Sequence, residues 1–401
     1  MEFSCGVCRK SFTNRLIKDL HEANCTGNER DETASASAVS PSGSPNGNNS
    51  RATLDVGGLL VGGLVGGALL AGAVYKVVKA MALNEGSTDT VDFRSPVNVK
   101  DLNRFIAENL QPTDEFKVEM GRAIDKICRF LHQEMRPDQI VKGGSLGKGT
   151  AVKGECDIDL VLVLNEVEDA EELKENLPTI VDDVIGKLRQ NRAELAIIPN
   201  SLKNARFLVK FSVQGEHGKI DVDLLPTFKV RDLQSLYRKM KTDTHNKEYY
   251  SVALAKQKVD FVENRPPNVK SLIRLVKYWK KKMVRAFSSD RRIPNSYLME
   301  LIIIHLWEEN TSGYGRFNTL KAFHGIMKTL DEYQSLNVIW TDNYRINDIP
   351  YHVRCTRPLV MDPANPMNNV CKRFVWEEIS IAAREVLESQ MMNGVSSDSW
   401  I

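Results

Sequence analysis

The sequence of 401 residues lacks a large net charge of either sign. Its 54 lysines and arginines nearly balance 52 aspartates and glutamates, which leaves a formal charge of +2. This balance excludes a uniformly basic protein, so any contact with nucleic acid must come from local basic patches. Hydrophobic residues make up 42% of the chain and charged residues 26%. These proportions exclude collagen-like and wholly disordered chains, and the length favours two or three domains.

The chain also lacks the cysteine pattern of a disulfide-stabilised protein. It contains seven cysteines, an odd number, and the last four are scattered singly over a long stretch at Cys128, Cys156, Cys355 and Cys371. Such usage indicates a reducing compartment, so we expect a cytoplasmic protein.

The first 25 residues have the spacing of zinc ligands, with Cys5, Cys8, His21 and Cys25 arranged as C-x2-C-x12-H-x3-C. Two thiolates from a knuckle and a His/Cys pair one helical turn apart can converge tetrahedrally on one Zn²⁺. Phe12 can supply the small apolar plug that such a finger needs. We therefore predict a zinc finger over 1–28, against the alternative of an N-terminal tail with incidental cysteines.

The next segment has no charge and almost no bulky apolar residue between 33 and 50. Such a composition cannot offset its ordering entropy, so 29–53 is predicted to be a disordered linker.

A glycine-rich hydrophobic segment follows over 54–82. The 20 residues from 56 to 75 contain no charge and seven glycines. A helix of this length would match a bilayer core, and Gly58, Gly62 and Gly66 have the spacing that lets helices approach closely. Glycine, however, is a poor helix former and adds little transfer energy. Two interpretations stay open: membrane association or helix self-association through 56–75, and an inert linker.

From about residue 93 the composition is that of an α/β enzyme. Apolar residues at spacings of three and four predict an amphipathic helix over 114–133. Dense apolar runs predict strands at 157–164, 207–213 and 219–225. Beyond about 250 the pattern is mostly helical. We expect a sheet-bearing lobe over 93–248 and a helical lobe over 249–390.

A glycine-rich stretch at 143–150 (GGSLGKGT) carries the first chemical signal. Glycines let backbone N–H groups approach phosphate oxygens, while Ser145 and Lys148 add a hydroxyl and a positive charge. A P-loop requires serine or threonine directly after Gly-Lys, and here Gly149 intervenes, so the Walker motif is excluded.

Paired aspartates follow within ten residues of this stretch. Asp157 and Asp159 lie at i and i+2 on a predicted strand, so both point to the same side of the sheet. Carboxylates this close repel unless a cation lies between them, and Mg²⁺ prefers oxygen ligands. A third carboxylate from Asp221 or Asp223 on a later strand would complete a two-metal site.

The segment GGSLGKGTAVKGECDIDLVLVL resembles the nucleotidyltransferase signature of the 2'-5'-oligoadenylate synthetases, within the DNA polymerase beta-like superfamily. VDLLPTF, RPPNVKSLIRLVKYW, SYLMELIIIHLWE, EYQSLNVIWTDNY and RPLVMDPANPMNNV resemble later family segments in the same order, so the resemblance runs from about 98 to 385. It implies an α/β fold with a polymerase beta-like lobe, a mixed sheet and an all-helical C-terminal lobe.

The resemblance also implies roles for individual residues. Asp157, Asp159 and Asp223 match the catalytic aspartates that hold two Mg²⁺ ions, which leaves Asp221 as a bystander. Ser145 matches a serine that contacts the donor triphosphate. Further nucleotide-binding positions are matched by Arg274, Lys277 and Tyr297, and one more is occupied by Ser296. Without the resemblance, a solvated helix face would explain the basic pair and a core position would explain the tyrosine.

The family joins the 2'-hydroxyl of one ATP to the α-phosphate of another, and double-stranded RNA activates it in antiviral innate immunity. A reader of A-form RNA needs cations spaced to meet phosphates and 2'-hydroxyls. The candidates for RNA binding are Arg104, Lys117, Arg122, Lys126, Arg129, Arg265 and Lys270.

The sequence departs from the family at one nucleotide-binding position, because Ser296 stands where a glutamine typically precedes the donor-pocket tyrosine. An alternative is therefore a cGAS-like receptor that makes a cyclic dinucleotide from ATP with GTP or another nucleotide on sensing double-stranded RNA. A third alternative is a catalytically silent RNA-binding adaptor.

Overall fold

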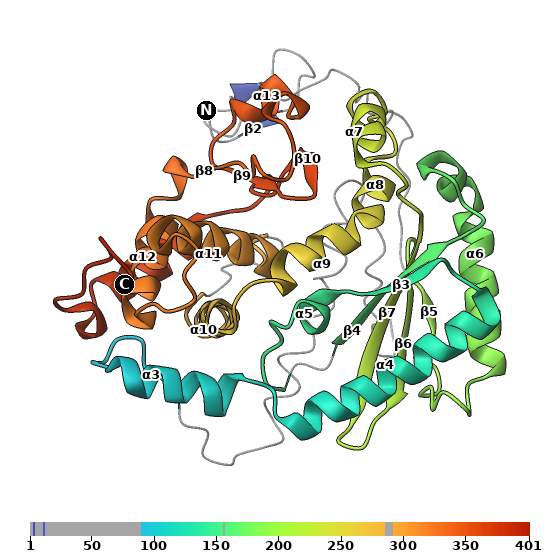
Figure 1. Ribbon diagram of the computed structural model, residues 1–401, viewed down its shortest axis with the longest axis horizontal. Coiled ribbons are helices and arrows are strands. Elements are labelled where there is room, and N and C mark those ends of the chain that lie inside the picture. Colours follow the sequence, from blue (N-terminus) through green and yellow to red (C-terminus); the bar gives the residue numbers. More distant parts are fainter. Residues whose placement is uncertain (1–2, 5–10, 13–89, 155–156, 285–291) are drawn as a thin grey trace, which may run out of the picture. The chain divides into compact units, whose positions relative to one another are not determined.

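The computed structural model describes residues 3–4, 11–12, 90–154, 157–284 and 292–401 (Figure 1). The chain divides into two compact units, 1–58 and 59–401. In the first unit, strands β1 (Phe3–Ser4) and β2 (Ser11–Phe12) pair antiparallel, with Phe3 opposite Phe12. The predicted zinc ligands, the linker and the glycine-rich segment all lie outside the described residues.

The second unit contains a five-stranded mixed sheet with the strand order β3-β4-β7-β6-β5. The central strands β4 and β7 run parallel, and the other neighbouring pairs run antiparallel. The bounds of the strands are β3 (Gln139–Lys142), β4 (Asp157–Leu164), β5 (Lys203–Asn204), β6 (Val209–Gln214) and β7 (Lys219–Phe228). The three predicted strands are confirmed within a few residues.

The two faces of this sheet differ because side chains alternate along each strand. Ile158 and Leu160 on β4 join the large core that includes Leu131 of α4 (Asp114–Met135) and Val181 of α6 (Ala170–Gln190). Val161, on the opposite face, belongs to a smaller apolar cluster with residues of the helices that follow the sheet. The predicted helix over 114–133 is confirmed as α4.

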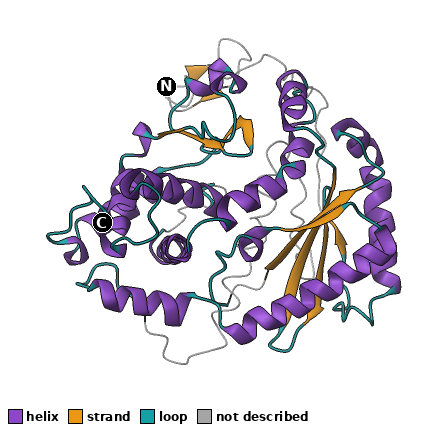
Figure 2. Cartoon of the chain, viewed as in Figure 1, coloured by secondary structure: helices purple, strands orange, loops and turns teal. Residues whose placement is uncertain are grey.

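Helices dominate the rest of the chain (Figure 2). Their bounds are α7 (Leu233–Thr242), α8 (Lys247–Ala253), α9 (Ala255–Glu263), α10 (Pro267–Met283), α11 (Ser296–Thr311), α12 (Thr319–Asp331), α13 (Tyr351–Arg354) and α14 (Glu377–Leu387). Short 3-10 turns are η2 (Tyr333–Ser335), η3 (Ile346–Asp348) and η4 (Gln390–Met392). Helix α11 is apolar almost all round and buried along most of its length, as expected for a central helix.

A second sheet lies within this helical region and is not expected from the sequence. It has three strands in the order β10-β9-β8, with β8 (Asn337–Val338), β9 (Leu359–Asp362) and β10 (Asn365–Asn369). Strand β9 is a fully buried run of four residues, too short for its periodicity to identify it in the sequence.

The segment before α4 packs with the helical region. It forms α3 (Val99–Phe105) and the π-helix η1 (Ile106–Leu110). The ring of Phe105 packs against that of Tyr278 on α10, with 5.3 Å between the ring centroids. The rings of Phe93 and Phe323 on α12 pack in the same way, with 5.6 Å between centroids. Among the described helices, none is both long and apolar enough to span a membrane.

Candidate nucleotidyl transfer site

The predicted catalytic aspartates lie on one face of the mixed sheet. In the parallel pairing of β4 and β7, Asp157 is opposite Asp221 and Asp159 is opposite Asp223. The i, i+2 spacing predicts a shared face for Asp157 and Asp159, and because cross-strand partners project to the same face, the strand register places Asp223 on that side as well. Asp221 shares this face.

The glycine stretch folds directly over Asp159. It forms the short turn α5 (Gly144–Gly147), and the Gly143 N–H donates to the Asp159 carbonyl at 2.7 Å. Gly144 has a φ of +58°, and a Cβ there would lie 1.7 Å from Asp159 Oδ2. Only glycine fits against the carboxylate at this position. The turn therefore holds partly buried Ser145 close to the aspartates.

The electrostatics of the aspartate cluster favour a bound cation. The pKa of Asp159 is raised to about 7, mainly by burial and then by the negative charges of Asp223 and Asp157. The positive charges of Lys148 and Lys210 lower this pKa but do not cancel the rise. Among the described residues, no three acidic, histidine or cysteine side chains are already gathered closely enough to hold one metal ion. Asp223 Oδ2 instead accepts a hydrogen bond from Lys210 Nζ at 2.7 Å. The oxygen donors nevertheless suit Mg²⁺, because a hard cation would relieve the repulsion that raises the Asp159 pKa.

The predicted basic pair on α10 contacts the loop that follows the glycine turn. Arg274 donates through Nε to the Ala151 carbonyl at 2.8 Å and through a terminal nitrogen to the Gly149 carbonyl at 2.6 Å. Lys277 Nζ donates to Thr150 Oγ1 at 3.0 Å. Arg274 and Lys277 therefore do not lie on a solvated helix face.

A buried carboxylate that sequence reasoning missed connects these elements. Glu300 on α11 is 2% exposed, and its oxygens lie 2.9 Å from Lys148 Nζ and 2.8 Å from Lys277 Nζ. Thr150 Oγ1 also donates to Glu300 at 2.9 Å. Burial opposes ionisation, but the two ammonium groups outweigh it and lower the pKa of Glu300 to about 2. The only signal in the sequence is one acid within the apolar run SYLMELIIIHLW.

Tyr297 lies beside this cluster. Lys148 Nζ is 4.3 Å from the centre of its ring, and its hydroxyl donates to Asp362 Oδ1 at 3.1 Å. Burial raises the pKa of Tyr297 well above its usual value. Ser296 is the first residue of α11 and is partly buried. The structure thus brings the loop and the start of α11 together.

The predicted RNA-binding residues fall into two groups. One exposed stripe of α4, at spacings of four and three, carries Arg122, Lys126 and Arg129. Arg122 also forms an ion pair with Glu216 at 3.0 Å. Lys117, also exposed on α4, pairs with Asp114 at 2.8 Å. Arg104 on α3 is exposed and forms an ion pair with Asp101. Helices α3 and α4 follow one another along one edge of the view in Figure 1.

The other two residues lie nearer the helical region. Arg265 is only partly exposed, pairs with Glu308 at 2.7 Å and stacks over the Phe261 ring. Lys270 on α10 faces the glycine stretch, because a Cβ on Gly149 would lie 3.3 Å from its Nζ. Lys270 therefore lies beside the glycine stretch.

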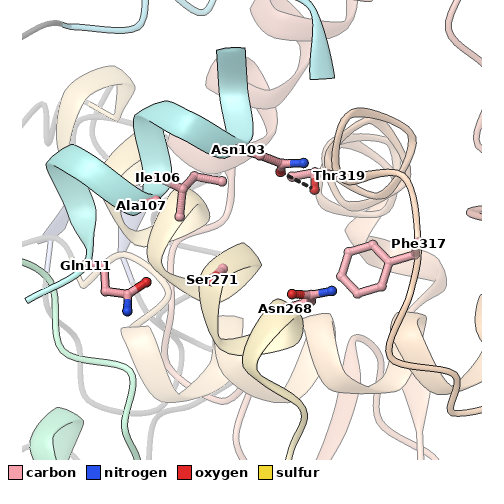
Figure 3. Close-up of a pocket in the computed structure, with 8 residues that line it drawn as sticks. All are labelled: Asn103, Ile106, Ala107, Gln111, Asn268, Ser271, Phe317 and Thr319. Atoms are coloured by element: carbon pink, nitrogen blue, oxygen red, sulfur yellow. Dashed lines mark hydrogen bonds between the residues drawn. The ribbon is translucent and has the colours of Figure 1, made fainter. Parts of the chain in front are cut away.

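A separate cavity of about 280 Å³ opens between η1, α10 and α12 (Figure 3). Its lining is amide, hydroxyl and apolar and includes no charged side chain: Asn103, Ile106, Ala107, Gln111, Asn268, Ser271, Phe317 and Thr319. It contains none of the aspartates and offers no cation to a triphosphate, so it is not the candidate nucleotide site.

Comparison with known proteins identifies relatives for most of the described chain. Residues 228–400 match the family described as "2'-5'-oligoadenylate synthetase 1, domain 2, C-terminus", and residues 122–287 match "Nucleotidyltransferase domain". The chain is 30% identical over 324 residues to 2'-5'-oligoadenylate synthase 2 of Homo sapiens, covering 72% of this chain and 44% of that protein.

Two mouse relatives show how the lengths compare. 2'-5'-Oligoadenylate synthase 3 of Mus musculus is 28% identical over 305 residues, which cover 69% of this chain and 27% of that protein. 2'-5'-Oligoadenylate synthase 1A of Mus musculus is also 28% identical over 305 residues, covering 67% and 81%. The chain thus spans about a quarter of the longest of these relatives.

Solved structures share the fold. CdnC of E. coli MS115-1, solved with ATP, matches with a TM-score of 0.51 at 21% identity, covering 73% of this chain and 89% of that one. The Cid1 poly(U) polymerase bound to MgATP matches with a TM-score of 0.51 at 16% identity, covering 74% and 94%. Together with the match of residues 122–287 to "Nucleotidyltransferase domain", these likenesses confirm the predicted polymerase beta-like nucleotidyltransferase fold.

Proposed function

Because this chain belongs to the 2'-5'-oligoadenylate synthetase family of nucleotidyltransferases, we propose that it polymerises ATP into 2'-5'-linked oligoadenylates when double-stranded RNA binds. In this reaction the 2'-hydroxyl of one ATP attacks the α-phosphate of another, and pyrophosphate leaves. The observation that carries the proposal is the register that sets Asp159 opposite Asp223 beneath the glycine turn.

Different residues would bind the metal ions, the donor triphosphate and the acceptor hydroxyl. Asp157, Asp159 and Asp223 would hold two Mg²⁺ ions, whose chemistry when bound is to lower the pKa of the attacking hydroxyl and to neutralise the leaving pyrophosphate. Asp223 would orient the acceptor hydroxyl toward the α-phosphate. Ser145 would donate a hydrogen bond to the donor triphosphate. Because the glycine turn lies against Asp159, phosphates bound to this turn would lie near that carboxylate.

The basic residues would bind the triphosphate without ligating metal. Lys148 and Lys277 carry two positive charges around one buried carboxylate, so their net charge with Glu300 is positive and faces the glycine turn. Arg274 fixes the loop at Gly149 and Ala151 and so sets the position of that charge. Tyr297, under Lys148, would form one wall of the donor pocket, with Ser296 beside it.

Double-stranded RNA would bind the exposed cations of α3 and α4. Arg122, Lys126 and Arg129 form a stripe that could follow a phosphate backbone, which requires no base-reading side chain. Lys270 faces the glycine stretch, so RNA contact there would reach the nucleotide site directly.

The test incubates the full chain with duplex RNA, Mg²⁺ and labelled ATP, alone and with GTP. The proposal predicts a linear ladder whose linkages resist a nuclease specific for 3'-5' bonds, with no ladder when RNA is omitted. A cyclic dinucleotide would instead assign the cGAS-like activity, and no product under any condition would indicate the adaptor.

The matched variants are Asp223→Asn and Asp221→Asn, which change neighbouring carboxylates on one strand and one face. We expect Asp223→Asn, like Asp157→Asn, to lose turnover while the protein remains folded, as judged by a cooperative thermal transition. Asp221→Asn should retain turnover. Asp221 lies two residues before Asp223 and further from the glycine turn, and its carboxylate already accepts a hydrogen bond from Ser212 Oγ at 2.6 Å. An active Asp223→Asn variant would contradict the assignment.

A further inference from the structure

The sheet face that carries the aspartates also carries a lysine that the proposed reaction does not use. Lys210 on β6 lies directly opposite Asp223, which in turn lies opposite Asp159. Because cross-strand partners project to one face, these three residues form a single row across β4, β7 and β6. Lys203, the partner of Lys210 on β5, continues the row toward the sheet edge.

Lys210 is joined to Asp223 by a close ion pair. Its Nζ lies 2.7 Å from Asp223 Oδ2, which is the length of a strong, charge-assisted hydrogen bond. The two side chains are only 35% and 19% exposed, so water screens this pair less than it screens a surface pair. The ammonium charge also reaches Asp159, where it opposes the effect of burial on the pKa.

An ammonium group and a divalent cation compete for the oxygens of one carboxylate. Protonated lysine has three donors and no lone pair, so it cannot join the ligand set of a metal. A Mg²⁺ ion approaches a carboxylate oxygen to about 2.1 Å, and its charge repels an ammonium held at the same group. A metal that uses Asp223 must therefore displace Lys210 or share the carboxylate with it at a cost in affinity.

We propose that Lys210 is a built-in competitor of the divalent cation at Asp223, and that it sets the Mg²⁺ concentration the enzyme requires. The proposal rests on the proposed function, because it takes Asp157, Asp159 and Asp223 as the metal ligands. Lys210 is a positioning residue in this account, since it acts through Asp223.

The test measures binding of Mn²⁺, as a probe for Mg²⁺, to the full chain by electron paramagnetic resonance. Lys210→Met keeps the length of the side chain and removes its charge, so Mn²⁺ should bind about tenfold more tightly at the Asp223 position. The matched control is Lys203→Met, one strand further from Asp223, which should change the affinity less than about twofold. Lys210→Gln serves as a second neutral variant if Lys210→Met melts at a lower temperature than the parent.

A double-mutant cycle isolates the route through Asp223. In an Asp223→Asn background, Lys210→Met should give a much smaller gain in Mn²⁺ affinity, because the carboxylate for which lysine competes is gone and only the longer-range charge of Lys210 on Asp159 is removed. Unchanged or weaker binding in Lys210→Met, or an equal gain in the Asp223→Asn background, would overturn the role of Lys210. If Asp157→Asn and Asp223→Asn both leave Mn²⁺ binding intact, the proposed function itself fails, which is a different result.

Discussion

Replacing Glu300 with glutamine tests whether the buried ionic cluster fastens the glycine turn to the helical region. The parent carboxylate accepts from Lys148, Lys277 and Thr150 and is almost fully buried. Glutamine keeps the size of the side chain but removes its charge. Two ammonium groups, 13% and 9% exposed, would then face each other without a counter-charge.

Two considerations give the expected loss in the free energy of unfolding. Removing one partner of a buried ion pair typically costs about 3 to 5 kcal/mol. The pKa of Glu300 is lowered from 4.5 to about 2, and at roughly 1.4 kcal/mol per pKa unit this shift corresponds to about 3 kcal/mol. Because the folded carboxyl binds its proton less tightly than the unfolded one, this stabilisation is complete above pH 5 and is lost as the pH falls toward 2.

The assay is urea unfolding of Glu300→Gln and the parent at pH 7 and at pH 3.5. We expect the free energy of unfolding to fall by about 3 kcal/mol at pH 7, and the difference between the two proteins to narrow at pH 3.5. Glu309→Gln, on the same helix but 60% exposed, should stay within about 0.5 kcal/mol of the parent. A Glu300→Gln variant as stable as the parent at pH 7 would refute the reasoning.

Three further predictions address the site and its surroundings. Without divalent cations, the melting temperature should fall as the pH rises from about 4 to about 7 and then level off, because the Asp159 pKa is raised from 3.8 to about 7 and the folded state therefore binds a proton in that range that the unfolded state has lost. Asp159→Asn should remove most of this fall. Gly144→Ala should lower both turnover and melting temperature, whereas Gly154→Ala, also at positive φ but with open space around its Cβ, should lower only the melting temperature, by a smaller amount. Lys126→Ala should weaken duplex RNA binding and make the slope of log Kd against log salt shallower by about one unit, and an unchanged slope would remove Lys126 from the RNA surface.

Local patterns in the sequence predict the strand that carries Asp157 and Asp159 and the turn that precedes it. The i, i+2 spacing of Asp157 and Asp159 predicts their common face. The glycines are expected to let the backbone approach phosphate oxygens, and the structure adds that Gly144 lies against the Asp159 carboxylate. The α4 helix follows from a regular apolar period over a long segment. These features depend on residues near one another in the chain.

Features that depend on distant pairing could not be predicted in this way. Lys210 meets Asp223 only because of the register of β6 against β7, which no motif encodes. Glu300 meets Lys148 and Lys277 across separate elements, so its single charge in an apolar helix carries no sign of its partners. Arg274 resembles any cation on an amphipathic helix until the loop it contacts is known.

In the proposed site, carboxylates from β4 and β7 gather divalent ions under the glycine turn. Anomalous diffraction from crystals grown with Mn²⁺ and a non-hydrolysable ATP analogue tests it most directly. We expect Mn²⁺ peaks bonded to oxygens of Asp157, Asp159 and Asp223, with the triphosphate against Ser145. Bound analogue with its Mn²⁺ away from all three carboxylates would contradict it.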